Sequence, residues 1–250
     1  VMSTCCLGES FDIHGGGSDL EFPHHENEIA QSEAATGKQY ANSWMHCGMI
    51  RINGEKMSKS LNNFFTIRDV LDKYHPEVVR YLLVSSHYRS AINYSEDSLR
   101  DSKGALERFY HALRGLPLVA AQGGEEFVER FAAAMNDDFG TPEACAVLFD
   151  LVREINRLRD SDAQAAAGLA GRLRELGGLL GVLQLEADDF LRAGAEGKVD
   201  AAEVEALIQA RLQARAEKNW AESDRIRDQI AAMGVVLEDK KGETTWRLAD

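Results

Sequence analysis

The spacing of hydrophobic residues changes along the chain and predicts two kinds of structure. Short apolar runs within residues 7–65 alternate with glycine and polar positions, which is typical of strands and short helices. Over 66–116 and 126–183, apolar residues recur every three or four positions, the period of an amphipathic helix. A glycine-containing stretch, 116–125, separates the two helical regions and predicts a loop. The pattern therefore predicts an α/β part followed by a helical bundle.

The most regular helical stripe lies within residues 135–158. Its apolar positions are Ala146, Leu148, Phe149, Leu151, Val152 and Ile155. Thr141 precedes Pro142, so we expect Thr141 to be the N-cap and Pro142 to be the first residue of this helix. The roles predicted for this segment are packing and spacing between domains, not chemistry.

A further region follows residues 192–200, RAGAEGKVD, whose small and charged residues predict a linker. We therefore expect three domains, over 1–75, 76–191 and 192–250. The last of these has its own pattern of short helices and strands.

Within the last region an alanine-rich helix is expected over 201–218. Asn219 with Glu222 three positions later forms a capping-box pattern for a helix over 220–233. Residues 235–248 then predict a β-hairpin around a Lys-Lys-Gly turn. The sequence thus predicts a small α/β module at this end of the chain.

At the other end, residues 7–23 predict a strand, a glycine turn and a helix start. Residues 11–13 have strand character, and Gly15–Gly17 allow positive φ and close approach of a ligand. Pro23 suits the first turn of a helix expected over 24–36, which Gly37 ends. Strand, glycine turn and helix form the nucleotide-binding geometry of a doubly wound sheet, and an ordinary tight turn is the alternative.

A lysine-rich segment follows a strand expected over 43–52. Residues 51–65 read RINGEKMSKSLNNFF, in which Lys56 and Lys59 lie three apart around Ser58. Ammonium groups on flexible stems follow phosphate charge, and serine hydroxyls add donors without bulk. The composition predicts a loop that closes over phosphate, with a solvated basic loop as the alternative.

Two residues of the helix expected over 24–36 have the spacing of metal ligands. His24 and Glu28 lie four positions apart and share a helix face. An imidazole and a carboxylate so placed are half of a tetrahedral zinc site. The alternative is a surface hydrogen bond, with Glu28 and Glu26 favoured near the helix N-terminus by its dipole.

Composition and charge narrow the function classes. The chain has 250 residues and a net charge of −13, which argues against a dedicated polyanion binder. Residues 191–250 carry only −2 of this charge, from 10 basic and 12 acidic residues, so they repel phosphate least.

The apolar runs are far shorter than the roughly 18 residues of a membrane span. The four cysteines are too scattered for a disulfide framework, which favours the cytoplasm.

Two motifs resemble one family. The string KMSKS is similar to the signature of class I aminoacyl-tRNA synthetases, and FDIHGGGSDLEFPHHENEIAQS with EKMSKSLNNFF resembles the cysteinyl-tRNA synthetases. The resemblance implies the C-terminal part of a Rossmann-type catalytic domain, a helical bundle and an anticodon-binding module. It implies ATP-dependent activation of L-cysteine with Mg²⁺, followed by its transfer to tRNA(Cys). The chain begins with Val1, and we expect a portion that lacks the N-terminal half with the HIGH motif and is inactive alone.

The resemblance also implies roles for individual residues. Catalysis falls to Lys56 and Lys59. ATP binding falls to Lys59, Ser58, Gly16 and Gly17, and the substrate pocket to His14 and Asp19. Trp44 and His46 line the adenylate pocket or, equally, pack in the interior.

In the family that this chain resembles, a zinc ion binds the thiolate of cysteine directly. The implied ligands in this chain are His24 and Glu28. The other two are cysteines of the missing region, because Cys5 and Cys6 fall several residues too late to match. Zinc favours a thiolate over a serine hydroxyl, so the metal supplies selectivity.

The implied anticodon-binding module offers candidates for tRNA contact. Trp246 is expected to provide a stacking face, and Arg225, Arg227 and Arg247 to provide donors, with salt bridges as the alternative. Arg89 is expected on the inside of the tRNA or, preferably, in a structural ion pair. A monomer is expected.

Two positions depart from the family pattern, and two other functions stay open. Asn62 stands where glycine is usual, and Gly140 where asparagine is usual. One alternative function is the related ligase that joins cysteine to an amino sugar, which needs no anticodon module. The other is a non-catalytic RNA-binding fragment.

Overall fold

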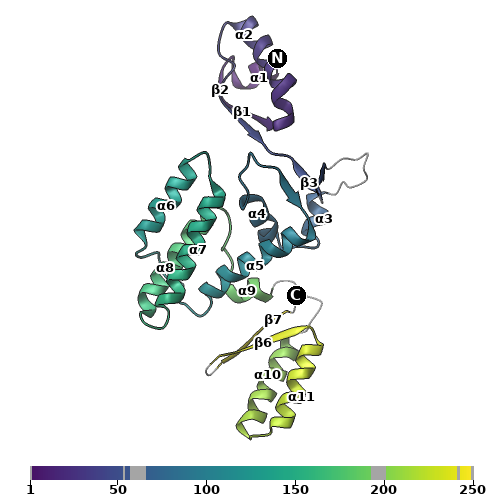
Figure 1. Cartoon of the computed structure of the whole chain (residues 1–250), viewed down its shortest axis with the longest axis vertical. Helices are drawn as coiled ribbons and strands as arrows, with labels where there is room; N and C mark the ends of the chain where they lie inside the picture. Colours follow the sequence, from purple (N-terminus) through teal and green to yellow (C-terminus); the bar gives the residue numbers. More distant parts are fainter. Residues whose placement is uncertain (1, 53, 57–65, 193–200, 241–242, 249–250) are drawn as a thin grey trace.

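The computed structural model of the protein describes residues 2–52, 54–56, 66–192, 201–240 and 243–248. Figure 1 shows an N-terminal lobe at the top, helices in the middle and a module with its own hairpin at the bottom. The N-terminal lobe contains α1 (Met2–Leu7), β1 (Phe11–Gly17), the 3₁₀ turn η1 (Ser18–Leu20), the π-helical turn η2 (Glu21–His25), α2 (Glu26–Thr36) and β2 (Ala41–Cys47).

Strands β1 and β2 are parallel neighbours joined through α2, which makes a β-α-β unit. The expected glycine turn is wrong, because Gly15–Gly17 lie inside β1. A Cβ on Gly16 would lie 2.7 Å from His25 Cε1. The glycine therefore allows the imidazole of His25 to pack against the strand.

The helix expected over 24–36 is confirmed in most of its length. Helix α2 ends at Gly37, which has a left-handed φ of 68° and donates its N–H to Glu33. Pro23 is not in the first turn of α2, because Phe22 before it is extended (φ −133°, ψ 134°). The proline lies in η2 instead.

A second sheet begins where the predicted strand over 43–52 breaks in two. Strand β3 (Ile50–Ile52) pairs with β4 (Glu55–Lys56) and, in parallel, with β5 (Ile92–Tyr94). The break lies at Gly48, whose N–H donates to Tyr88 O over 2.7 Å. A Cβ there would lie 2.1 Å from Ser90 O, so only glycine fits against this turn.

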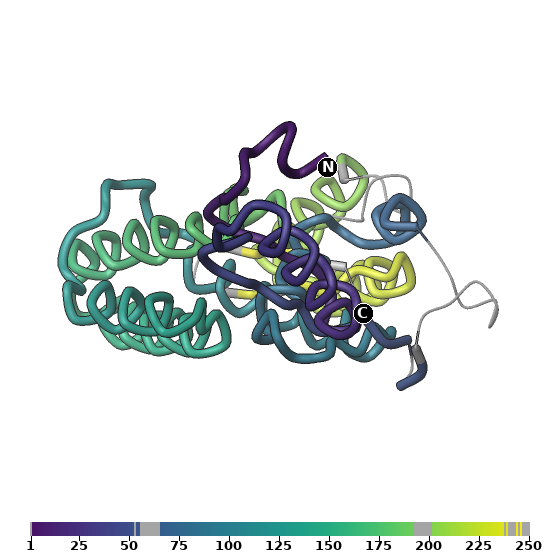
Figure 2. The backbone as a smooth tube through the Cα atoms, turned by 90° about the horizontal axis from the view of Figure 1, so that it is seen from above, coloured from purple at the N-terminus to yellow at the C-terminus, as the bar shows by residue number. Residues whose placement is uncertain are grey.

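Seven helices follow β4 in the described residues up to 192. They are α3 (Ile67–Leu71), α4 (Pro76–Val84), α5 (Glu96–Leu113), α6 (Glu125–Asn136), α7 (Thr141–Leu158), α8 (Ala163–Leu179) and α9 (Ala187–Arg192). Figure 2 shows α6, α7 and α8 side by side at one end of the molecule. Residues at the predicted apolar spacing, among them Leu148, Leu151 and Ile155, are fully buried in one core with Leu99 and Leu106.

The start of α7 differs by one residue from the prediction. Gly140 is the N-cap and Thr141 is the first helical residue. The Thr141 hydroxyl donates to Ser86 O over 3.3 Å and so is not used to cap the helix.

The C-terminal module consists of α10 (Ala201–Ala216), α11 (Trp220–Ala232), β6 (Val235–Lys240) and β7 (Glu243–Leu248). The antiparallel hairpin is confirmed, and Asn219 caps α11 by accepting the N–H of Glu222 over 3.3 Å. The module has its own core of Val204, Ile208, Ile226, Ile230, Val235 and Trp246. The domain division at 1–75, 76–191 and 192–250 stays a prediction.

In the described residues, helices long and apolar enough to cross a membrane are absent.

Candidate active site and RNA-binding surface

Side chains from both strands of the β-α-β unit meet side chains from the crossover. His14 on β1 is paired in register with Trp44 on β2, and Gly16 with His46, so these positions share a face. The His14 ring lies 4.8 Å from the Trp44 ring and 4.7 Å from the His25 ring, between ring centroids. The result is a cluster of imidazole and indole rings beside α2.

Polar contacts tie this cluster to Glu28. Nε2 of His14 lies 3.0 Å from Oε2 of Glu28, and Nδ1 of His25 lies 2.9 Å from Nε2 of His46. One donor atom each from His14, His25 and Glu28 lies within 4.8 Å of the other two. The structure therefore brings His14, a predicted pocket residue, together with Glu28, a predicted metal ligand.

His25 is the buried member of the cluster, with 3% of its surface exposed. Burial disfavours its charged form and, together with the neighbouring His14, lowers the pKa of His25 below its ordinary value of 6.5. A neutral imidazole keeps a lone pair, which is the form that binds metals. His25 therefore has the protonation state of a ligand at neutral pH.

Glu28 has an atom whose hydrogen-bonding capacity is unused. Oε2 is buried and makes no hydrogen bond to any described residue, since its close contact with His14 is not aligned as one. A buried carboxylate oxygen without a hydrogen bond is costly, so a bound cation would satisfy it. The donor chemistry of imidazole and carboxylate also suits zinc.

The predicted ligand His24 stands at the edge of this cluster. Its side chain is 62% exposed, and its Nε2 lies 3.9 Å from Oε1 of Glu28. Donor atoms about 2.0–2.1 Å from a tetrahedral zinc ion lie roughly 3.3 Å apart. The 3.0 Å spacing of His14 and Glu28 is close to this value, whereas the 3.9 Å spacing of His24 and Glu28 is longer.

Asp19 lies in η1, directly after β1. It lines a hollow of about 400 Å³ with Ser18, Glu21, Phe22 and Glu26. Three of these five side chains are carboxylates, so the hollow favours a cationic group such as an ammonium.

Some of the predicted ATP-binding residues belong to the described part of the chain and others do not. Gly16 and Gly17 lie at the C-terminal end of β1, the end at which ligands bind in parallel α/β sheets. Ser58 and Lys59 lie outside the described residues, and so does Asn62. The backbone of Lys56 belongs to β4, and its side chain is outside the described part.

Trp246 is not the stacking face that the sequence suggested. Its ring is 0% exposed, and its Nε1 donates to Glu205 Oε1 over 2.9 Å. The guanidinium of Arg192, at the end of α9, lies 5.1 Å from the ring centroid. The ring lies on the face of the hairpin that α10 and α11 cover, so it packs in the core of the module. Strand β7, which carries the ring, also contacts α9.

The predicted basic contacts are occupied by ion pairs. Arg225 binds Glu222 with Nη2 to Oε1 at 2.6 Å, and Arg227 lies 3.2 Å from a carboxylate oxygen of Asp224. Both guanidinium groups are exposed on α11. The side chain of Arg247 lies outside the described part.

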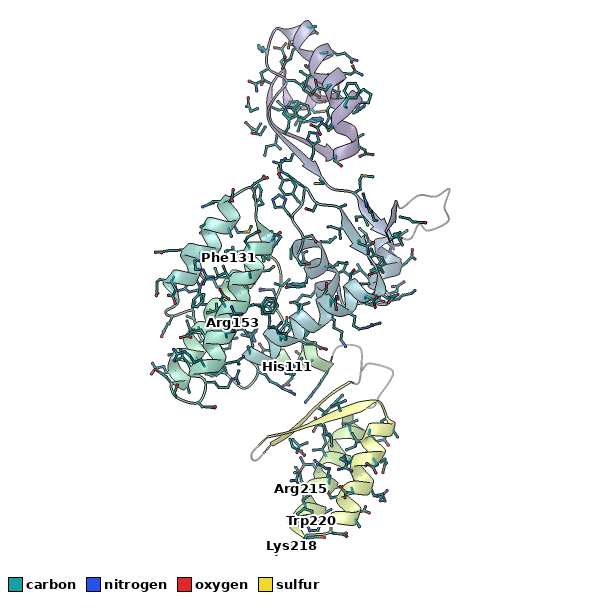
Figure 3. All side chains as sticks on the ribbon, in the orientation of Figure 1. His111, Phe131, Arg153, Arg215, Lys218 and Trp220 are labelled. Carbon is teal, nitrogen blue, oxygen red and sulfur yellow. The ribbon has the colours of Figure 1, made fainter. Side chains whose placement is uncertain are left out.

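An exposed tryptophan lies elsewhere on the same module. Trp220, the first residue of α11, is 60% exposed. Arg215 lies in the last turn of α10, 3.4 Å from a carboxylate oxygen of Asp239, and Lys218 lies between α10 and Trp220. Figure 3 shows all three residues at the far end of the module. An aromatic face flanked by cations is the pattern that binds single-stranded RNA bases and phosphates.

Three of these residues were not expected from sequence in these roles. His25 is adjacent to His24 and three positions from Glu28, so helical spacing indicates it equally well. His46 joins the cluster only through the register of β1 and β2, which a sequence does not specify over such a separation. Trp220 follows the predicted N-cap Asn219, a position that is exposed in most helices.

Comparison with known proteins agrees with the geometry. The tRNA synthetases class I (C) catalytic domain matches residues 1–104, the DALR domain 130–184, and the Cysteinyl-tRNA ligase anticodon binding domain 201–247. These matches confirm the expected fold: part of a class I catalytic domain, then a helical region, then a small α/β module.

Curated relatives match the whole of the chain. A "Cysteine--tRNA ligase" of Pseudomonas putida is 93% identical over 250 residues, which is 100% of this chain and 54% of that protein. One of Pseudomonas fluorescens is 86% identical over the same shares. A solved ternary complex of LeuRS, tRNA and LeuAMS from Agrobacterium radiobacter has a TM-score of 0.47 and 20% identity over 70% of this chain and 28% of that one. The chain spans about half the length of the curated relatives that it matches, and it belongs to the cysteinyl-tRNA synthetase family of class I aminoacyl-tRNA synthetases.

Proposed function

We propose that this chain forms part of a cysteine–tRNA ligase, which activates L-cysteine with ATP and transfers the cysteinyl group to tRNA(Cys). The observation that carries the proposal is the 93% identity to a cysteine–tRNA ligase over every residue of the chain. The match of 201–247 to an anticodon binding domain favours this function over the amino-sugar ligase, which has no use for an anticodon.

The reaction has two displacement steps. A carboxylate oxygen of cysteine attacks the α-phosphorus of ATP, and pyrophosphate leaves with its electron pair. A hydroxyl of the terminal ribose of tRNA then attacks the carbonyl carbon of the adenylate, and AMP leaves. Neither step needs a side-chain nucleophile, so catalysis consists of positioning and charge stabilisation.

The residues proposed for the first step carry charge or allow close approach. The ammonium groups of Lys56 and Lys59 offset charge on the leaving pyrophosphate, with a hydroxyl donor from Ser58. Gly16 and Gly17 allow a nucleotide to approach the strand end. Mg²⁺ is the cation that ordinarily accompanies ATP in such sites.

Asp19 and His14 line the proposed cysteine pocket. The carboxylate of Asp19 faces a hollow rich in negative charge, which suits the α-ammonium group of the amino acid. His14 contacts Glu28 and fixes the orientation of that carboxylate.

We propose that His24 and Glu28 hold a zinc ion with two further ligands from polypeptide outside this chain. The buried Oε2 of Glu28, which lacks a hydrogen bond, and the position of its Oε1, 3.9 Å from Nε2 of His24, support this assignment. When bound, zinc supplies a Lewis acid that binds thiolate sulfur in preference to a hydroxyl oxygen.

Metal analysis of the completed ligase tests these ligands. The completed ligase is residues 1–250 joined in register to the part of the P. putida relative that this chain does not cover. His24→Ala and Glu28→Gln are expected to lose zinc, whereas Glu26→Gln, a carboxylate on the same helix turn, is expected to keep it. Full zinc content in His24→Ala with loss in His25→Ala would assign the site to the buried cluster instead.

We propose that tRNA contacts the C-terminal module through Trp220, Arg215 and Lys218. Arg225, Arg227 and Arg247 are further candidates for phosphate contact. Arg215, Arg225 and Arg227 would exchange their intramolecular ion pairs for phosphate. The exposed ring beside two cations supports the surface around Trp220. The domain division at 192 fits a separate module of this kind.

We further propose that the ligase acts as a monomer in the cytoplasm. The sparse, unpaired cysteines of the described part support a reducing compartment. Sedimentation of the completed ligase at micromolar concentration tests the first point, and a dimer would contradict it.

Cysteinylation of tRNA(Cys) tests the function as a whole. The completed ligase is expected to charge tRNA(Cys) with cysteine and to release pyrophosphate, and the isolated chain is expected to bind tRNA without charging it. A completed ligase that binds tRNA but neither forms adenylate nor charges tRNA would support the non-catalytic RNA-binding function instead.

A further inference from the structure

Two turns that are distant in sequence meet at Asp138. The turn between α4 and β5 contains His87, Tyr88 and Arg89, and the turn between α6 and α7 contains Asp138 and Phe139. Arg89 Nε lies 2.6 Å from Oδ2 of Asp138 and its Nη2 3.2 Å from Oδ1. The Tyr88 hydroxyl donates to Oδ1 over 2.7 Å, and His87 Nε2 lies 2.9 Å from the Asp138 carbonyl oxygen. One aspartate therefore joins three successive side chains, a contact that we call the Asp138 joint.

The contact at Asp138 is better defined geometrically than an ordinary surface ion pair. Isolated surface pairs contribute little, but a two-pronged Arg–carboxylate contact with a further donor fixes orientation. Hydrogen bonds from Arg89 and Tyr88 hold the pKa of Asp138 at about 2, from an ordinary value of 3.8. The carboxylate is therefore ionised throughout the physiological pH range.

The backbone at the joint is held in an unfavourable conformation. Asp138 and Phe139 have φ of 52° and 55°, in the left-handed region, which aspartate tolerates but which a bulky residue such as Phe139 rarely adopts. Such residues persist where surrounding contacts determine them, and they concentrate at functional sites. The Tyr88 and Phe139 rings also lie edge to face, 6.4 Å between centroids. The contacts of the joint thus hold this turn in one shape.

On its other side the joint is connected to the catalytic part. The N–H of Gly48 donates to Tyr88 O, and the N–H of Ile92 donates to Met49 O over 3.0 Å. Strand β5, which follows the turn directly, pairs with β3 along its whole length. Backbone hydrogen bonds therefore connect the segment between β2 and β3 to this turn, and the side chains of the turn connect it to Asp138.

On the bundle side, Asp138 begins the connection to α7. Helix α7 packs on α5, α6 and α8, and α5 contacts α9, which in turn contacts β7 of the C-terminal module. The helices that lead to the proposed RNA-binding surface are thus packed on the same body as Asp138. The joint and the packing of α5 on β5 together connect that body to the β3–β5 sheet.

We propose that Asp138 and Arg89 are positioning residues that hold the helical bundle, and with it the tRNA, in register with the catalytic sheet β3–β5. The inference rests on the proposed function and deepens it. Adenylate formation needs only the catalytic part, whereas transfer needs the terminal ribose placed against the adenylate. Loss of the joint should therefore impair the second step and spare the first.

The test compares both steps in the completed ligase carrying Asp138→Asn. Pyrophosphate exchange with cysteine reports the first step, and kcat/KM for tRNA(Cys) charging reports the whole reaction. We expect charging to fall roughly 2- to 30-fold, the range found for residues that couple distant sites, with exchange unchanged within about twofold. Arg89→Ala should have a similar effect, and the double variant should be no worse than either single one.

A matched control is Asp150→Asn. Asp150 also pairs with two arginines, Arg130 and Arg153, but all three lie within α6 and α7. This variant should leave the ratio of charging to exchange unchanged. Equal loss of both activities in Asp138→Asn would show a purely structural role and overturn the proposal, and so would no loss in either. A parent ligase inactive in both assays would instead overturn the proposed function.

Discussion

The two tryptophans of the C-terminal module are expected to respond in opposite ways to substitution. Trp246 is fully buried, and its Nε1 donates to Glu205, whereas Trp220 is 60% exposed. Trp246→Ala should unfold the module. Trp220→Ala should leave it folded and weaken binding of tRNA.

The magnitudes follow from burial. Removing a buried tryptophan side chain costs about 3–5 kcal/mol. A module over 201–248 has a total stability of roughly 2–7 kcal/mol at the usual 0.05–0.15 kcal/mol per residue. Trp246→Ala therefore removes from about two fifths to all of its stability. Trp220→Ala should change stability by about 0.5 kcal/mol or less. Loss of a base-stacking partner should cost about 1–3 kcal/mol of binding, roughly 5- to 150-fold in affinity.

Hydrogen exchange read by mass spectrometry measures the first effect within the whole chain. Amides of α10 and α11 should lose protection in Trp246→Ala and keep it in Trp220→Ala, while those of α7 should be unchanged in both. Filter binding at fixed salt measures the second effect. A protected module in Trp246→Ala would refute the assignment of this ring to the core, and unchanged tRNA affinity in Trp220→Ala would refute the surface.

Three further predictions concern single contacts. Glu77→Gln should lower stability by about 1–3 kcal/mol in urea denaturation, because a buried carboxylate that accepts the Tyr110 hydroxyl at 2.8 Å would present an amide group instead; unchanged stability would contradict this. Gly48→Ala should lower the melting temperature, since its Cβ would lie 2.1 Å from a backbone carbonyl oxygen, at a cost of about 1–3 kcal/mol; an unchanged melting temperature would show that the turn adapts. The hydrogen bond from Arg211 lowers the pKa of Asp239 below 3.8, so its stabilisation is complete above about pH 4 and is lost as pH falls toward the depressed value. Circular dichroism from pH 6 to 2 should show a smaller acid loss in Asp239→Asn than in the parent, and identical curves would contradict this.

The helical part of the fold can be predicted from sequence because the residues at the helical spacing are the ones that pack in the core. The stripe of Leu148, Leu151, Val152 and Ile155 recurs every three or four residues, and all four side chains are buried in the bundle core. Asn219 caps its helix as predicted, since a cap depends on residues a few positions away.

The sequence alone does not predict the role of a residue that is determined by contacts with distant parts of the chain. Glycine permits both tight turns and close packing, and only the position of His25 shows that Gly16 serves the second purpose. The alternation of side chains along a strand places Trp246 and its strand neighbours on opposite faces of the hairpin. The sequence does not show which of these faces α10 and α11 cover. The metal pair His24 and Glu28 is readable from helical spacing, and its assignment stays a prediction.

The central claim is that this chain contributes the phosphate-binding lysines of a cysteine-activating enzyme. Pyrophosphate exchange by the completed ligase with Lys59→Ala tests it most directly, with Lys38→Ala, a lysine paired to Glu9 outside the segment, as the control. We predict that exchange falls by about 10²-fold or more in Lys59→Ala, as for loss of a group that stabilises transition-state charge, and stays at the parental rate in Lys38→Ala. Parental exchange in Lys59→Ala would contradict the account.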